Sequence, residues 1–207
     1  MSNRHAPPPK RSRRTQQPRR IVRLLTEGRR TEVEYLAKWA AVHRERVTVD
    51  FDPFHGTPMS LVDRAVTLVE QRLRTIRRGR SDSPFDEIWC VFDRDEQPYV
   101  DEAIALAASH EIGVAFSNPC FELWLVLHAN DLRRHTERHA VQSMSAELGF
   151  TVGKGLAPNA WPILQSAWEA AEDRAVTLDA MHTSNGSPVG SNPSTSVAQV
   201  VRSLHRA

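Results

Sequence analysis

The stretch Ile88-Trp89-Cys90-Val91-Phe92-Asp93-Arg94-Asp95 decides the fold class of this 207-residue chain. Its first five residues form an unbroken apolar run, which is typical of a strand covered on both faces in the middle of a parallel sheet. Two carboxylates, Asp93 and Asp95, follow at once. Ligands of open α/β sheets bind outside the carboxyl ends of the strands, so this pair is predicted to lie where a site would form.

Apolar runs and helical patterns alternate along residues 21–130. Strands are predicted at 21–25, 47–51, 88–92 and 112–116. Helices are predicted from Thr31, whose spacing to Glu34 is typical of a capping box, from Ser60, from about Val100 and from Asn118-Pro119. This alternation predicts an α/β fold with a doubly wound, mostly parallel four-stranded sheet and helices on both faces.

The C-terminal part of the chain has no strand pattern and is predicted to be helical. Helices are expected at about 134–148, 158–178 and 195–206, and residues 182–194, rich in Ser, Asn, Gly and Pro, are predicted to form a loop. The predicted organisation is a basic tail at 1–20, an α/β core at 21–130 and a helical C-terminal extension at 131–207 that packs on the core.

The formal net charge of +2 is divided unequally along the chain. Residues 1–20 contain seven Lys and Arg and no Asp or Glu, which leaves 20 basic and 25 acidic residues for the rest. This tail is rich in proline and poor in apolar residues, so it is predicted to be disordered. It is either an arm that attracts phosphate backbones or a solubilising extension. A transit peptide is a third interpretation, which Pro7-Pro8-Pro9 opposes by disfavouring an amphipathic helix.

The sequence contains no feature typical of a membrane or a secreted protein. No apolar stretch approaches the roughly 20 residues that span a bilayer, and the N-terminus has no apolar signal core. We therefore expect a soluble cytoplasmic protein. Cys90 and Cys120 form no CxxC pair and are expected to be small buried side chains. The sequence leaves open whether the protein forms a homo-oligomer.

Carboxylates follow three of the predicted strands. Glu27 follows 21–25, Asp93 and Asp95 follow 88–92, and Glu122 comes shortly after 112–116. At about 4 Å and an effective dielectric near 20, two such charges repel by about 4 kcal/mol, which a divalent cation offsets. Mg²⁺ and Mn²⁺ prefer carboxylate and water oxygens, and two ions stabilise both oxygens of a phosphodiester displacement. A Mg²⁺ or Mn²⁺ site is therefore predicted. The alternative is that Asp93 and Asp95 form a solvated turn.

Other polar residues are expected near the same edge of the sheet. Arg29 and Arg30 stand at a predicted helix N-terminus, where they either bind substrate phosphates or are simply solvated. His55, in the loop after 47–51, and Asn118, at the start of a predicted helix, are further candidates for contact with substrate. His135 and His139 are four residues apart but lack the H-E-x-x-H pattern of a zinc site, and they are expected to be exposed.

These motifs resemble those of known proteins. Glu27-Gly28 after the first strand and Asp93-x-Asp95 after the third are similar to the Toprim fold of topoisomerases, primases and overcoming-lysogeny-defect nucleases. More narrowly, the chain resembles the RloB-like family over roughly residues 20 to 205, in Thr26–Gly28 with Thr31-Glu32, Val91–Asp95, Phe116–Leu125 and Asn192–Thr195. Its most specific motif is Ser117-Asn118-Pro119-x-Phe121-Glu122-Leu123-Trp124.

The resemblance implies a Toprim-like fold and a metal-dependent nuclease of phage defence and abortive infection. It implies DNA or RNA as substrate and a partner ATPase of the AAA or ABC type encoded nearby. It also implies that Glu27 acts as acid, base or metal ligand, that Asp93 and Asp95 bind the metal, and that Glu122 holds a second ion. Lys154 is similar in placement to a lysine near the scissile phosphate, and the alternative is a solvated loop lysine.

Two other classes compete with a nuclease. A non-catalytic regulatory subunit of an ATPase complex would use the same carboxylates to bind a metal or to shape an interface. A phosphatase of the haloacid-dehalogenase type also has D-x-D after a strand, but on its first strand and with Thr or Val where Gln97 stands here. The position of the motif on the third predicted strand argues against the phosphatase.

Overall fold

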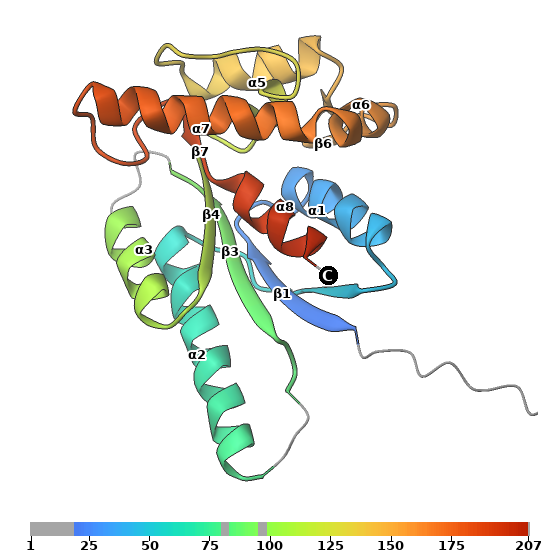
Figure 1. The fold of residues 1–207 in the computed structure, drawn as a ribbon, viewed down its shortest axis with the longest axis vertical. Coiled ribbons are helices and arrows are strands. Elements are labelled where there is room, and N and C mark those ends of the chain that lie inside the picture. Colours follow the sequence, from blue (N-terminus) through green and yellow to red (C-terminus); the bar gives the residue numbers. More distant parts are fainter. Residues whose placement is uncertain (1–18, 80–82, 95–98, 207) are drawn as a thin grey trace, which may run out of the picture.

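The computed structural model describes residues 19–79, 83–94 and 99–206. Within these residues, a five-stranded sheet has the strand order β2-β1-β3-β4-β7 (Figure 1). Its strands are β1 (Arg20–Thr26), β2 (Val47–Phe51), β3 (Glu87–Asp93), β4 (Gly113–Asn118) and β7 (Ser194–Thr195). The first four pair in parallel, and β7 is antiparallel to β4. A mixed α/β fold with a mostly parallel sheet is thus confirmed.

The prediction of a four-stranded sheet was wrong, because β7 adds a fifth strand at the edge of β4. β7 contains two residues, which is too short for the alternation that marks a strand in a sequence. The same reason explains why the hairpin of β5 (Thr151–Val152) and β6 (Gly155–Leu156) was not predicted. This hairpin forms a separate two-stranded sheet.

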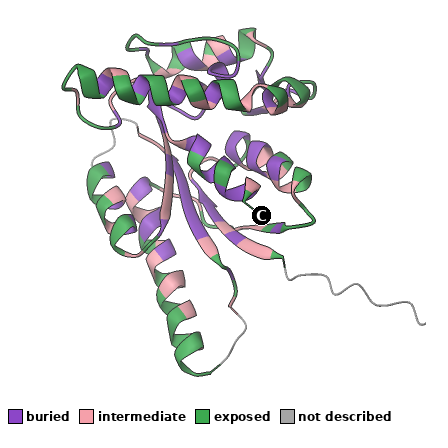
Figure 2. Cartoon of the chain, in the orientation of Figure 1, coloured by how far each residue is buried: buried purple, intermediate pink, exposed green. Residues whose placement is uncertain are grey.

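Helices cover both faces of the main sheet (Figure 1). On one face, α2 (Pro58–Arg77) and α3 (Val100–Ser109) enclose a cluster of buried side chains with residues of β3 such as Phe92. The larger cluster on the other face involves α1 (Thr31–Val42), α4 (Glu122–Val126) and α8 (Val197–His205). The apolar run of β3, residues 88–92, is buried throughout, as predicted for a central strand (Figure 2).

The remaining helices form a layer above the carboxyl ends of the parallel strands (Figure 1). These are α5 (Arg138–Glu147), α6 (Trp161–Ser166) and α7 (Trp168–Ser184). The helix predicted at 134–148 begins four residues later, and the helix predicted at 158–178 is two helices separated at Ala167. The division of the chain at residue 130 stays a prediction, although β7 and α8 beyond it pack on the main sheet.

The start of α2 differs from the prediction. Pro58 is its first residue, and the side chain of Thr57 caps it by accepting a hydrogen bond from the backbone nitrogen of Ser60 at 3.4 Å. The residue that caps this helix is therefore Thr57, three residues before Ser60, from which the helix was predicted. Proline at the first helical position lacks only an N–H that the helix would not use, which favours this start.

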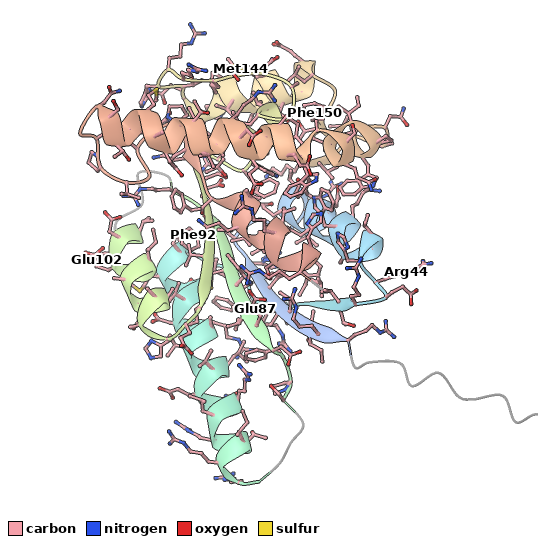
Figure 3. The ribbon with its side chains drawn as sticks, viewed as in Figure 1. Arg44, Glu87, Phe92, Glu102, Met144 and Phe150 are labelled. Atoms are coloured by element: carbon pink, nitrogen blue, oxygen red, sulfur yellow. The ribbon has the colours of Figure 1, made fainter. Side chains whose placement is uncertain are left out.

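Thr31 and Glu34 do not form the predicted capping box. Thr31 lies inside α1, and its hydroxyl donates to the carbonyl oxygen of Lys154 at 3.0 Å. The carboxylate of Glu34 accepts a hydrogen bond from the backbone nitrogen of Leu156 at 2.7 Å. The two side chains thus attach the β5–β6 hairpin to α1. Phe150, directly before β5, belongs to the larger buried cluster, and Met144 of α5 packs against that cluster; both are labelled in Figure 3.

Two predictions about individual segments can be compared directly with the structure. Cys90 and Cys120 are both buried and free, as expected. Throughout the described ranges, every helix is too short or too polar to cross a bilayer. The basic tail lies outside the described residues, apart from Arg19 and Arg20.

Candidate active site

A cleft of about 580 Å³ lies at the carboxyl ends of β1 and β3. The turn after β1, the first turn of α1, the end of β3, the start of α4, one side of α5 and the β5–β6 hairpin all contribute to it. Its lining residues are Glu27, Gly28, Arg29, Arg30, Thr31, Glu32, Asp93, Glu122, Arg138, Gln142, Ala146, Thr151, Gly153 and Lys154. Segments far apart in the sequence therefore meet at the edge of the sheet that the sequence indicated.

Glu27 and Asp93 are direct neighbours in this cleft. The backbone nitrogen of Glu27 donates to the carbonyl oxygen of Val91 at 2.9 Å, which continues the pairing of β1 with β3 by one residue. The carboxylate of Glu27 in turn accepts a hydrogen bond from the backbone nitrogen of Asp93 at 3.0 Å. Parallel pairing of two strands that end at the same level thus places both acidic residues side by side.

Glu122 reaches the same cleft from a different element. It is the first residue of α4 and follows β4 after a short turn. The predicted start of this helix at Asn118-Pro119 was wrong, because Asn118 is the last residue of β4 and α4 begins at Glu122. Glu122 nevertheless lies in the first turn of the helix, near the end of the sheet, as predicted. Asp95, the remaining carboxylate of the predicted set, lies outside the described residues.

Glu32 is a residue of the cleft to which the sequence analysis assigned no role. It lies in the first turn of α1 and is only 8% exposed. Its carboxylate packs against the α-carbon of Gly28, where an added Cβ would lie 2.1 Å from both carboxylate oxygens. Glycine at position 28 therefore gives Glu32 the space to enter the cleft. Thr31-Glu32 was among the motifs that carry the family resemblance, but the sequence analysis assigned no chemical role to Glu32.

Burial and neighbouring carboxylates raise the pKa values of two acidic residues of the cleft, Asp93 and Glu32. The pKa of Asp93 lies well above its usual value, first because the group is buried and then because Glu32, Glu27 and Glu122 are close, while Arg138 acts in the opposite direction. Burial is also the largest cause that raises the pKa of Glu32 from 4.5 to about 7, and Glu122 and Glu27 add to it. Several negative charges are thus held together at a cost in stability.

Positive groups surround this acidic centre. Arg138, the first residue of α5, places Nη1 3.0 Å from Oδ2 of Asp93. Arg29, Arg30 and Lys154 line the cleft from exposed positions, so the three predicted contacts with substrate phosphates lie at the acidic centre. Arg30 is also paired with Glu34 of the same helix at 3.4 Å.

The donor atoms of the cleft suit a hard divalent cation. Glu27, Glu32, Asp93 and Glu122 all offer carboxylate oxygens, which Mg²⁺ and Mn²⁺ prefer. A cation would also offset the repulsion that raises the pKa values of Asp93 and Glu32. Among the residues that the structure describes, however, no three His, Cys, Asp or Glu side chains stand close enough to form a ready-made centre. In this structure one carboxylate oxygen of Asp93 forms an ion pair with Arg138.

Two predicted substrate contacts lie outside this cleft. The ring nitrogen Nδ1 of His55 lies 2.8 Å from the carbonyl oxygen of Thr26, and His55 is absent from the lining of the cleft. Asn118 lines a smaller neighbouring cavity, and its Nδ2 donates to the carbonyl oxygen of Gly190 at 2.8 Å. His55 lies in the loop after β2 and Asn118 is the last residue of β4, but both side chains are directed to backbone partners.

Fold and site together define a mixed α/β protein with an acidic cleft, surrounded by cations, at the carboxyl ends of its parallel strands. The family model described as RloB-like protein matches residues 22–204. The chain therefore belongs to the RloB-like family. No curated protein and no solved structure matched the chain.

Proposed function

We propose that this protein is a Mg²⁺- or Mn²⁺-dependent nuclease of the Toprim type, which hydrolyses phosphodiester bonds of DNA or RNA in phage defence. The proposal rests on one observation: Glu27, Glu32, Asp93 and Glu122 line a single cleft whose margin carries Arg29, Arg30 and Lys154. Resemblance to Toprim nucleases and membership of the RloB-like family support it.

The charges of the cleft are arranged as this reaction requires. The acidic residues of the centre would hold the cation, which would supply Lewis-acid stabilisation of the oxygens in a phosphodiester displacement. Arg29 and Lys154 at the margin can orient the anionic substrate over these carboxylates. Thr31 holds the backbone of Lys154 against α1, which limits where the lysine side chain can reach.

A partner is part of the proposal. The chain has no G-x-x-x-x-G-K-[ST] sequence, so any dependence on ATP would come from a separate ATPase. Residues 21–207 carry more acidic than basic residues, which opposes binding to nucleic acid without help. The basic tail or the partner ATPase would supply the missing affinity.

The test is cleavage of single-stranded and duplex DNA and RNA by the purified full chain, alone and with the ATPase encoded nearby. Mg²⁺ or Mn²⁺ should support cleavage, and EDTA should abolish it. Asp93→Ala should lower the rate on the order of a hundredfold or more, because it removes a central carboxylate of the cleft. Asp63→Ala, at an exposed position on α2, is the matched control. Equal cleavage by the wild type and Asp93→Ala would reject the proposal.

The ion pair between Arg138 and Asp93 favours a second candidate function. A cationic side chain already reaches the acidic centre from within the protein, so the cleft is also suited to an arginine or lysine of another chain. The protein would then be a non-catalytic regulatory subunit of an ATPase complex. Capture of the ATPase that persists in Asp93→Ala and Glu27→Ala, without nuclease activity under any condition, would favour this alternative.

A further inference from the structure

A second cavity, of about 250 Å³, adjoins the acidic cleft and has the opposite charge. Its lining residues are Arg94, Asn118, Pro119, His135, Glu137, Arg138 and Asn192. Arg138 lines both cavities, and Arg94 directly follows Asp93 in the chain, so the two sites share a border. Of the described residues around the smaller cavity, Glu137 is the one that carries a carboxylate.

Arg94 is held in place for binding an anion. Its side chain is 18% exposed, its guanidinium lies 6.0 Å from the ring centre of Phe116, and an added Cβ at Gly190 would lie 3.1 Å from its Cδ and Nη1. Its ion pair with Asp101, 2.7 Å between Nη2 and Oδ1, involves a carboxylate that is 75% exposed. Because this carboxylate is largely exposed, the pair contributes little stability, and an anion in the cavity can compete with Asp101 for the guanidinium.

The amide side chains of the cavity are also fixed. Asn118 donates to the carbonyl oxygen of Gly190, as described above. Asn192 accepts from the backbone nitrogen of Thr136 at 3.1 Å and donates to its carbonyl oxygen at 3.0 Å. These bonds fix the walls of the cavity before any ligand enters. A rigid, planar guanidinium in such a site suits the oxygens of a phosphate.

We propose that this cavity binds a phosphate of the nucleic-acid backbone next to the phosphodiester held at the acidic cleft. The inference rests on the proposed function and adds a subsite to it. Two arginines and His135 favour an anion, and the border shared through Arg138 favours an anion attached to the substrate of the acidic cleft. A free phosphate has the same chemistry, so the experiment must separate the two sources.

The experiment measures the affinity of the full chain for fluorescein-labelled single-stranded and duplex oligonucleotides over a range of NaCl concentrations, with Ca²⁺ and with EDTA. Arg94→Gln should weaken binding about tenfold and lower the slope of log Kd against log salt by about one. His135→Glu should weaken binding severalfold, because it places a negative charge at an exposed position of the cavity.

Glu137→Gln provides the sharpest test, because loss of folding cannot explain its effect. Removing this carboxylate should tighten binding severalfold, although the start of α5 loses a negative charge that favours the helix. Arg133→Gln is the matched control: it removes one positive charge from an exposed side chain that is absent from the cavity lining, and it should leave affinity within about twofold. Thermal unfolding of each variant checks that the fold is intact.

Equal affinities and salt slopes for Arg94→Gln, Glu137→Gln and Arg133→Gln, or no oligonucleotide binding by the wild type either alone or with the partner ATPase, would overturn the subsite. If inorganic phosphate raises the Tm of the wild type but not of Arg94→Gln, while oligonucleotide binding is the same in both, the cavity binds free phosphate and the backbone proposal is rejected. Cleavage is scored separately with Asp93→Ala. Binding changes as predicted without any cleavage would count against the proposed function alone.

Discussion

Replacing Glu32 by glutamine is expected to stabilise the protein above neutral pH. The substitution keeps the shape of the side chain but removes a negative charge that is buried beside Glu27 and Glu122. The cleft holds several negative charges close together, so removing one of them lowers the repulsion and stabilises the folded protein.

The magnitude follows from the pKa of Glu32, which burial raises from 4.5 to about 7. The difference corresponds to about 3 kcal/mol. Because the folded-state pKa is the higher one, Glu32 is neutral in both states below pH 4.5 and costs nothing there. Between pH 4.5 and 7 the unfolded chain releases its proton before the folded protein does, so stability falls as pH rises. The full cost applies above pH 7.

Asp93 adds to this effect in the same direction. After burial, the charge of Glu32 is the largest of the causes that raise the pKa of Asp93. Neutralising Glu32 therefore makes ionisation of Asp93 less costly as well. For a chain of this size, about 3 kcal/mol corresponds to a rise in Tm of roughly 6–12 °C at pH 8.

The assay is urea and thermal unfolding of the wild type and Glu32→Gln from pH 4 to 8 in EDTA. The two proteins should be equally stable near pH 4 and should diverge as pH rises. Glu102→Gln, on the exposed side of α3, is the matched control and should parallel the wild type (Figure 3). Adding Mg²⁺ at pH 8 should stabilise the wild type more than Glu32→Gln. A stability difference between wild type and Glu32→Gln that does not change with pH would refute the argument from buried charge.

Three further predictions concern two residues of the cleft, Gly28 and Thr31, and one buried histidine of the core, His128. Gly28→Ala should displace the carboxylate of Glu32, whose oxygens would lie 2.1 Å from the new Cβ, and weaken Mg²⁺ binding in calorimetry by about tenfold without lowering the urea midpoint. Thr31→Val removes the hydrogen bond to the carbonyl oxygen of Lys154, so hydrolysis should fall about tenfold while the free energy of unfolding changes by about 1 kcal/mol. His128 is buried, and burial lowers its pKa to about 4, so the unfolded chain binds a proton at a higher pH than the folded protein does. The free energy of unfolding of the wild type should therefore fall by about 3 kcal/mol relative to that of His128→Gln as the pH falls from 6.5 to 4. Parallel profiles of unfolding free energy against pH would contradict this.

The sequence predicted the main sheet well because its strands are marked by local composition. β3 contains an unbroken run of five buried apolar residues, and β1 contains the apolar pairs Ile21-Val22 and Leu24-Leu25 on either side of Arg23. Polar residues directly follow both stretches. β5, β6 and β7 have two residues each, which is too short for a recognisable pattern, and β7 also depends on pairing with the distant strand β4. The break between α6 and α7 at Ala167 is marked by neither glycine nor proline, so the helical pattern continues through it.

The candidate site was predictable where the backbone alone fixes a position. Glu27 and Asp93 directly follow paired parallel strands, so their proximity follows from the register Thr26 to Val91. The position of the Glu32 side chain depends instead on how α1 is rotated about its axis. This rotation decides whether a residue of the first turn faces the cleft or the solvent. Arg138 comes from a helix placed by tertiary packing, and no local pattern links it to Asp93.

Arg138 connects the two proposed sites physically. It pairs with Asp93 at 3.0 Å and lines both the acidic cleft and the smaller cavity. Its guanidinium would be released from Asp93 when a cation binds to the carboxylates, and it would then be available to an anion on its other side. Binding of a phosphate there would in turn withdraw Arg138 from Asp93 and favour cation binding by the same factor, since coupling between two sites is reciprocal. The ion pair between Arg138 and Asp93 was the observation that favoured a non-catalytic role. The same ion pair is equally expected in a nuclease whose metal and substrate bind together.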